Sequence, residues 1–325
     1  MGAKLRRAAQ RGRHLAVVGV PTIQRRWRGA WLRLRHAAAL AWLPPLSAPP
    51  ANPSLEVHML SGHAQADMGV WASWSVLRFL PEARLCVHSD GTLTEADRAR
   101  WARVVPGARF VSRAEADALC AARLRPRFAL LRRWRDAHLL ALKLVDGHLL
   151  AEADHVLVMD TDVLCFQPPT LVEQCVAGRD GSVWMTDMHW SYLALPRVLH
   201  EALGMTVAPQ VNSGFWLAPR AGEADWAMMS WALHCLRNDG RCDWAHAWAE
   251  QTMTGIWLSM RDGGRPLPRT YAVVPGRTPR EQVVHHYVGT RTVRPRFFTE
   301  GVCRLRRQLR EQGASFVEAS EEAVM

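Results

Sequence analysis

Short apolar runs alternate with stretches of helical periodicity from about residue 54 onward. His155–Met159 is typical of a buried strand, because the four residues after His155 are all apolar and leave no polar face. Strands are predicted on such patterns at residues 55–60, 84–88, 108–112, 155–159, 182–187, 211–218 and 283–287. Helices are predicted between the first strand and about residue 80, at 94–104, at 137–150 and at 244–259. This alternation predicts an α/β fold with a mainly parallel, mixed sheet and helices on both faces.

Two local signals mark boundaries in this pattern. Thr94, with Asp97 three residues later, is a candidate N-cap for the helix at 94–104. Five prolines form a linker ahead of the first strand: Pro44, Pro45, Pro49, Pro50 and Pro53. We therefore expect a basic, tryptophan-containing tail with a proline-rich linker at 1–53, a folded domain at 54–301, and a C-terminal helix with an acidic tail at 302–325.

The formal charge of +11 is concentrated in the N-terminal tail. Residues 1–55 hold ten of the 41 basic residues and no acid, which leaves 31 basic against 30 acidic residues in the rest. The folded domain is therefore close to neutral, which argues against nucleic acid as the main ligand. The chain has only two lysines, so Lys143 is the single lysine of the domain.

The tail carries aromatic and apolar residues at helical spacing: Trp27, Trp31, Leu34, Ala38 and Trp42. A basic helix with tryptophans on one side suits an anionic membrane surface, here through residues 1–43. The alternatives are a loosely ordered arginine-rich leader and a helix packed on the domain. No apolar stretch reaches the roughly 20 residues of a membrane span, and no long apolar core of a secretory signal follows the first arginines.

Cysteine usage is consistent with a reducing compartment. The seven cysteines include no Cys-x-x-Cys pair. His234, Cys235, Cys242 and His246 come nearest to a zinc pattern, but loop and core positions are the default interpretation of that segment. The predicted location is the cytoplasm, with peripheral attachment to the inner face of the membrane as an option.

Asp160 and Asp162 directly follow the apolar run at 155–159. In an extended backbone residues i and i+2 face the same side, so the two carboxylates can converge on one ligand. Adjacent anionic groups repel unless a cation lies between them, and a hard divalent ion is the simplest occupant. The alternative is an ordinary acidic strand end.

Three later segments strengthen the metal interpretation. Asn212-Ser213-Gly214 interrupts an apolar strand, and a glycine there permits close approach of a ligand or another backbone. Glu250 and Gln251 lie in a predicted helix that could face the same cleft, and His286 precedes a tight turn at Gly289. Imidazole together with two carboxylates is a reasonable ligand set for Mn²⁺.

In this order the segments resemble glycosyltransferase family 8, the retaining GT-A group that includes glycogenin and bacterial lipopolysaccharide galactosyl- and glucosyltransferases. The resemblance covers residues 55–301 and implies a GT-A (Rossmann-like) fold. The Asp-x-Asp motif of the family falls on Asp160 and Asp162, and its His-x-x-Gly falls on His286 and Gly289, so these acids and His286 would bind Mn²⁺ (or Mg²⁺). The Asn-[Ala/Ser]-Gly strand of the family falls on Asn212, Ser213 and Gly214.

The resemblance also implies roles for residues beside the metal. The donor-contacting basic residue of the family falls on Lys143, and its acidic-Gln pair resembles Glu250 and Gln251, with Glu in place of the usual Asp. Asp187 could hold a donor or acceptor hydroxyl, or could be an ordinary strand-end acid. Two departures concern the nucleotide. The Leu60–Gln65 segment gives no assignable base contacts, and Thr290–Arg294 replaces the usual Lys-Pro-Trp, so that Arg291 or Arg294 could bind the pyrophosphate.

The predicted activity is metal-dependent transfer of a hexose from a nucleotide-diphosphate sugar, with UDP favoured, to a saccharide, glycolipid or other hydroxyl acceptor, with retention. A role in bacterial polysaccharide biosynthesis is the expected setting. A nucleotidyltransferase on the same fold is one alternative, and a non-catalytic membrane-surface binding protein with a degenerate glycosyltransferase domain is another. A phosphatase of the haloacid dehalogenase type is disfavoured, because such enzymes need a lysine after the acidic motif and none follows Lys143.

Overall fold

The computed structural model describes residues 39–41, 43–124, 126–178, 181–239, 244–289 and 293–311. The chain divides into two compact units, Met1–Leu43 and Pro44–Met325. The fold described below is that of the second unit. The predicted helix with tryptophans in the tail, the acidic C-terminal tail and Arg291 lie outside the described residues.

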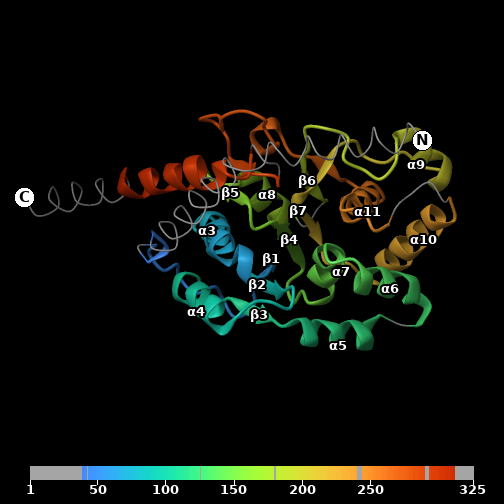
Figure 1. Ribbon diagram of the computed structural model, residues 1–325, viewed down its shortest axis with the longest axis horizontal. Helices are drawn as coiled ribbons and strands as arrows, with labels where there is room; N and C mark the ends of the chain where they lie inside the picture. The colour runs from blue at the N-terminus through green and yellow to red at the C-terminus, as the bar shows by residue number, and fades with distance from the viewer. Residues whose placement is uncertain are drawn as a thin grey trace, which may run out of the picture. The chain divides into compact units, whose positions relative to one another are not determined.

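A seven-stranded sheet forms the centre of the second unit (Figure 1). Its strands are β1 (Leu55–Ser61), β2 (Arg84–Ser89), β3 (Arg109–Val111), β4 (His155–Met159), β6 (Val183–Thr186), β7 (Val211–Pro219) and β8 (Arg265–Pro266). Their order is β3-β2-β1-β4-β7-β6-β8. All neighbouring pairs are parallel except those of β7, which runs antiparallel to both β4 and β6. The predicted mainly parallel, mixed sheet is therefore confirmed.

Helices cover both faces of the sheet. They are α3 (Ala66–Leu77), α4 (Glu95–Val104), α5 (Arg113–Arg123), α6 (Ala129–Ala137), α7 (Ala141–Leu149), α8 (Thr170–Gly178), α9 (Pro196–Leu203), α10 (Glu223–Asp239) and α11 (Trp248–Ser259). A Cβ at Gly69 of α3 would lie 3.2 Å from the sulfur of Met59 in β1, whereas one at Gly147 of α7 would lie 3.9 Å from Cβ of His58. Because Met59 and His58 are adjacent in a strand, they face opposite sides, and so do α3 and α7.

The two-stranded ribbon of β5 (Val163–Cys165) and β9 (Val284–His286) lies outside the main sheet. Its antiparallel register places Val163 opposite His286. The ribbon therefore brings a segment near the end of the domain beside the residues that follow β4. Among the described residues, no helix combines the length and hydrophobicity needed to cross a membrane.

Glu56 of β1 makes an ionic network inside the fold. Its side chain is fully buried and lies 2.9 Å from the guanidinium of Arg84 and 3.2 Å from that of Arg109. The backbone N–H of Glu152 also donates to it at 2.7 Å. Burial alone would raise the pKa of Glu56, but His58, Glu152 and Arg109 lower it well below its usual range. The alternation of polar and apolar residues in β1 thus reflects two buried faces, of which one is ionic.

One predicted helix is wrong in its boundaries. Instead of a single helix at 137–150, α6 ends at Ala137 and α7 begins at Ala141, with His138 in an extended conformation between them. Nε2 of His138 lies 3.0 Å from the carbonyl oxygen of His246. This contact with a segment more than 100 residues away helps to hold the chain between α6 and α7 in its non-helical conformation. The local sequence does not predict the interruption.

The predicted N-cap of the helix at 94–104 is confirmed as a capping box. The Thr94 hydroxyl accepts from the Asp97 N–H, and the Asp97 carboxylate accepts from the Thr94 N–H at 2.9 Å. Burial alone would raise the pKa of Asp97, but hydrogen bonds from Thr94, His63 and Arg100 lower it to about 2.

Asp97→Asn is therefore expected to destabilise the domain by about 0.5–2 kcal/mol at pH 7, the usual range for loss of a helix cap. Because the folded-state pKa of Asp97 is depressed, its contribution is complete above the unfolded pKa of about 4 and is lost as the pH falls toward 2. Urea unfolding of wild type and variant at pH 7 and at pH 3 measures this. A free-energy difference that does not shrink at pH 3 would contradict it.

Candidate functional site

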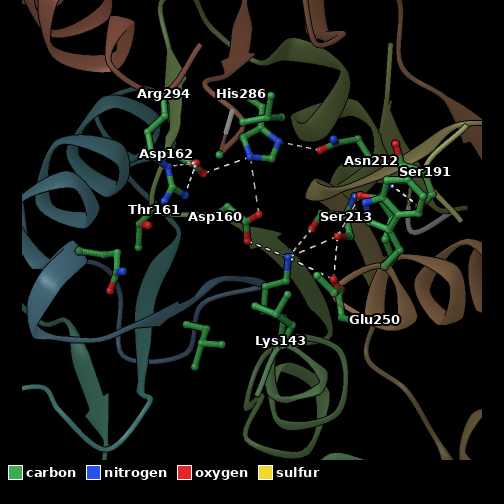
Figure 2. Close-up of a pocket in the computed structure, with 18 of the residues that line it drawn as sticks. Lys143, Asp160, Thr161, Asp162, Ser191, Asn212, Ser213, Glu250, His286 and Arg294 are labelled. Atoms are coloured by element: carbon green, nitrogen blue, oxygen red, sulfur yellow. Dashed lines mark hydrogen bonds and ion pairs between the residues drawn. The ribbon is translucent and has the colours of Figure 1, made fainter. Parts of the chain in front are cut away.

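A pocket of about 700 Å³ opens where β1, β2 and β4 end. In open α/β sheets, ligands bind outside the carboxyl ends of the strands. Nearly all of the described residues that the sequence singles out line this pocket: Lys143, Asp160, Asp162, Asp187, Asn212, Ser213, Glu250, Gln251, His286 and Gly289. Figure 2 shows how the labelled members of this set turn toward one another. Gly214 lies behind the lining, and Arg291 is outside the described residues.

Asp160 and Asp162 converge because of a turn, not because of strand alternation. Strand β4 ends at Met159, and the Val163 N–H donates to the carbonyl oxygen of Asp160. The prediction that the pair lies in extended backbone is therefore wrong, although its consequence holds. Oδ2 of Asp160 and Oδ1 of Asp162 lie 3.7 and 3.0 Å from Nε2 of His286.

Asn212 fixes the orientation of the His286 ring. Nδ1 of His286 lies 2.8 Å from Oδ1 of Asn212, and this oxygen also accepts from the Gly214 N–H at 2.9 Å. A side-chain amide oxygen only accepts hydrogen bonds, so Nδ1 carries a proton and Nε2 faces the two carboxylates (Figure 2). Burial would lower the pKa of His286, but Asp162 and Asp160 raise it. A cation at this point would take the place of the proton on Nε2.

Gly214 supplies the space for that ring. A Cβ at this position would lie 2.4 Å from both Cε1 and Nδ1 of His286, which is closer than real atoms approach. The sequence predicts close approach of a ligand or another backbone at Gly214; the structure places an imidazole there. The Asn-Ser-Gly segment therefore packs against the side chain of His286, which belongs to β9.

Each acid of the pair gives one oxygen to His286 and the other to a cation. The Lys143 ammonium donates to Oδ1 of Asp160 at 2.8 Å, and the Arg294 guanidinium donates to Oδ2 of Asp162 at 2.7 Å. Burial alone would raise the pKa of Asp162, but His286 and Arg294 lower it to about 2. Oδ2 of Asp160, Oδ1 of Asp162 and Nε2 of His286 are thus left facing one another.

This donor set fits a divalent cation. Asp160, Asp162 and His286 each offer a ligand atom, and the three atoms lie within 4.8 Å of one another. Two carboxylate oxygens and one imidazole nitrogen suit Mn²⁺ or Mg²⁺ better than a soft ion. A bound ion would also screen the repulsion between the two carboxylates.

Lys143 joins the metal cluster to a second buried acid. Its side chain is only 5% exposed, and its ammonium lies 3.3 Å from Oε2 of Glu250 and 3.3 Å from Oγ of Ser213. Burial would lower the pKa of Lys143, but Asp160 and Glu250 raise it, so it stays charged. Glu250 also accepts from Ser213 at 2.8 Å and from Thr254 at 2.9 Å. Both oxygens of Glu250 are therefore occupied within the protein.

Asp187 and Gln251 form a polar wall of the pocket beside Lys143 and Glu250. Nε2 of Gln251 donates to Oδ2 of Asp187 at 3.1 Å and to the Ser191 carbonyl oxygen at 3.1 Å. Asn212 donates to the same Asp187 oxygen at 3.3 Å. Asn212 thus contacts both His286 and Asp187, which couples the positions of the metal cluster and this wall.

Asp90 and Trp248 also line the pocket, although the sequence does not single them out. Asp90 directly follows β2, and its carboxylate occupies the space that a Cβ at Gly62 would need. Its Oδ1 accepts from Thr92 at 2.8 Å. Trp248 lines the pocket although 45% of its surface is exposed. The Ser-Asp-Gly turn after the second strand is a signal for Asp90, whereas nothing in the local sequence distinguishes Trp248 from the other tryptophans.

Gly214→Ala is expected to lower Mn²⁺ affinity at least about tenfold, the usual effect of displacing a group that orients a metal ligand. The added methyl group would push His286 off Asn212. Gly178→Ala is the control, because no atom lies within 4 Å of a Cβ there. Isothermal titration with Mn²⁺ measures the effect. Equal affinities in the two variants would show that the ring does not need this space.

Lys143→Met is expected to cost about 3–5 kcal/mol of folding free energy, because it leaves the carboxylate of Glu250 buried without a cation. Adding Glu250→Gln should restore most of that loss. Burial raises the pKa of Glu250 even beside Lys143, which makes its unpaired charge costly. Urea unfolding of the wild type, the two single variants and the double variant gives a double-mutant cycle. A double variant less stable than Lys143→Met would contradict the pairing.

Comparison with known proteins bears on the fold. No protein-family model matches the sequence, and no curated protein matches it significantly. Mouse xyloside xylosyltransferase 1 in its apo form is similar with a TM-score of 0.51 at 12% identity, over 75% of this chain and 99% of that one. The apo structure of the bifunctional glycosyltransferase WbbM is similar with a TM-score of 0.50 at 12% identity, over 76% of this chain and 48% of that one.

The galactosyltransferase LgtC, in complex with donor and acceptor sugar analogs, has 17% identity and a TM-score of 0.49, over 74% of this chain and 93% of that one. The xylosyltransferase and WbbM similarities show that the chain has the α/β GT-A fold of glycosyltransferases.

Proposed function

We propose that the protein is a metal-dependent glycosyltransferase that moves a hexose from a nucleotide-diphosphate sugar to a saccharide or other hydroxyl acceptor. One observation carries the proposal. On a GT-A fold, the pocket at the strand ends holds two carboxylates and an imidazole with three donor atoms facing one another. The cations Lys143 and Arg294 hold the outer oxygens of the same carboxylates.

Asp160, Asp162 and His286 would hold Mn²⁺ or Mg²⁺. When bound, the ion would neutralise negative charge that builds on the diphosphate as the glycosidic bond breaks. Arg294 is 46% exposed in its side chain and lines the pocket, so its guanidinium can reach a phosphate while Asp162 binds the ion. Arg291, which the resemblance places at the donor, is a further candidate for the same contact.

Lys143 is the buried cation that pairs with Asp160. Its ammonium is buried and already bonded to Asp160, Ser213 and Glu250, which fixes the direction of the Asp160 carboxylate. Glu250 in turn acts as a positioning residue, because its oxygens are occupied by Lys143, Ser213 and Thr254. The positive charge of Lys143 lies within the pocket wall and would add to the field that stabilises a leaving diphosphate.

Gln251 and Asp187 line the remaining side of the pocket and would face the sugar. Cleavage of the glycosidic bond gives the sugar oxocarbenium character, which the amide oxygen of Gln251 could stabilise. Asp187, held by Asn212 and Gln251, would bind a hydroxyl of donor or acceptor. Asn212, Ser213, Gly214 and Gly289 would complete the donor side. Retention of configuration is proposed from the family resemblance.

We further propose UDP as the nucleotide and a saccharide or glycolipid as the acceptor, in bacterial polysaccharide biosynthesis. The predicted place of action is the cytoplasm, with attachment to the inner face of the membrane through the basic residues of 1–43 as an option.

Asp162→Asn is expected to reduce Mn²⁺-dependent hydrolysis of the donor sugar by at least about a hundredfold, the scale on which loss of one charge-stabilising group acts. The matched control is Asp154→Asn, because Asp154 is exposed and lies just before the same strand. A panel of UDP- and GDP-sugars with Mn²⁺, analysed by chromatography, measures the reaction. Equal hydrolysis by the two variants would contradict the metal site.

The products of the same assay separate the proposal from its nearest rival. A glycosyltransferase releases a nucleoside diphosphate from the sugar nucleotide, whereas a nucleotidyltransferase working with a nucleoside triphosphate and a sugar phosphate releases pyrophosphate. Pyrophosphate formation, with no hydrolysis of any nucleotide sugar, would favour the nucleotidyltransferase.

A further inference from the structure

A second group of potential metal ligands lies inside the domain, and none of its members lines the pocket. His58 belongs to β1, and Cys86 and His88 belong to β2. In the parallel register His58 is opposite Cys86, and His88 follows two residues later, so the three share one face of the sheet. Each exposes at most 2% of its surface. One ring nitrogen of each histidine and Sγ of Cys86 lie within 4.8 Å of one another.

Glu56 determines which nitrogen of His58 is free to bind an ion. Oε2 of Glu56 lies 3.2 Å from Nε2 of His58, and the carboxylate is paired with Arg84 and Arg109. Because an ionised carboxylate only accepts, Nε2 of His58 carries the proton and Nδ1 has the lone pair. This lone pair faces Nε2 of His88 at 2.7 Å. A carboxylate on the far nitrogen of a histidine is the usual way in which proteins orient a metal-binding imidazole.

The ring of His88 makes one hydrogen bond, to His58, and its other nitrogen has no partner among the described residues. If its Nε2 donates to His58, its Nδ1 needs a donor, yet Nδ1 is buried and has no hydrogen-bond partner among the described residues. Buried polar atoms without partners are few in native proteins and need an explanation. Its other nitrogen, Nε2, lies 2.7 Å from Nδ1 of His58, and both His58 and Cys86 are potential ligands on the same face of the sheet.

The surrounding charges favour a soft ion of low charge. The buried Glu56 and the exposed Glu152 together balance Arg84 and Arg109 in one ionic network. Cys86 would add one negative charge on binding a metal as thiolate. A monovalent cation would then leave the network neutral, whereas a divalent cation would leave one positive charge without a partner, which is costly in the interior. Thiolate and imidazole ligands select Cu⁺ or Zn²⁺ and disfavour Mg²⁺ and Mn²⁺.

We propose that His58, Cys86 and His88 form a buried site for a thiophilic d¹⁰ cation, with Cu⁺ favoured over Zn²⁺ by charge balance. The ion would tie β1 to β2 beneath α7. A Cβ at Gly147 of α7 would lie 3.9 Å from Cβ of His58 and from Cε1 of His88, so this helix rests directly on the cluster. The same helix carries Lys143, but the site does not depend on the proposed glycosyl transfer.

The test uses the full chain produced in medium supplemented with copper or with zinc. Purification is anaerobic and without chelators, with excess Mg²⁺ to occupy the oxygen-rich cluster. Metal per chain is measured by plasma mass spectrometry. One equivalent is expected in wild type and in Cys120→Ser, and its loss is expected in Cys86→Ser. Cys120 is the matched control because it is also a buried thiol, 1% exposed. Cys303→Ser controls for an exposed thiol.

X-ray absorption at the metal edge of the wild-type protein keeps the proposal testable if Cys86→Ser does not fold. One sulfur and two imidazole nitrogens are expected around the ion. Wild type without copper or zinc, metal retained in Cys86→Ser, metal lost in Cys303→Ser, or a shell of oxygen alone would each overturn the site. A higher occupancy with copper than with zinc would support the charge argument, and the reverse would overturn that preference.

Discussion

The ammonium of Lys143 is the contact on which the architecture of the pocket depends. It lies on α7 and reaches Asp160 after β4, Ser213 in β7 and Glu250 in α11. Four separate elements therefore meet at one buried cation. A buried charge is stable only when its partners are correctly placed, so this group requires the sheet and two helices to adopt a single arrangement. It also lies 3.3 Å from Oε2 of Glu250, so this carboxylate balances the charge of the lysine.

Around this cation, each of the two acids has one oxygen paired with a cationic side chain and one oxygen facing His286. The oxygens of Asp160 and Asp162 that point away from His286 are bound to Lys143 and Arg294, and the inner oxygens remain for an ion. Lys143 is buried, whereas Arg294 lies at the pocket mouth. One acid thus has a permanent cationic partner, and the other has a partner that solvent or a ligand can reach. Asn212 contacts both His286 and Asp187, so one residue links the two sides of the pocket.

Sequence reasoning succeeds where the pattern is local. The apolar run at 155–159 and the acids after it give β4 its bounds, and Thr94 with Asp97 marks the start of α4, because each signal lies within a few residues. It fails where a distant partner decides. His138, between α6 and α7, contacts His246, and the buried Glu56 is paired with arginines from two other strands.

The two ligand clusters show the same division. The acids of the pocket are adjacent and follow a recognisable strand, so the sequence points to them, and family resemblance adds His286. Cys86 and His88 are two residues apart, but His58 joins them only through the register of β1 and β2. The short-spaced residues that come nearest to a zinc pattern in the sequence, Cys235 and His246 among them, are not part of the cluster of His58, Cys86 and His88. Strand pairing is long-range information that spacing does not carry.

The packing of His286 against Gly214 makes the set of three candidate metal ligands depend on the folding of distant segments. The acids follow β4, the glycine lies in β7, and the imidazole arrives on β9, more than 120 residues after the acids. The ligand set is therefore absent until the β5–β9 ribbon has docked against the end of β7, which makes it a late product of long-range folding. An ion bound as proposed would therefore require the last third of the chain to have folded, and a nascent chain that has made only the first four strands would not hold it.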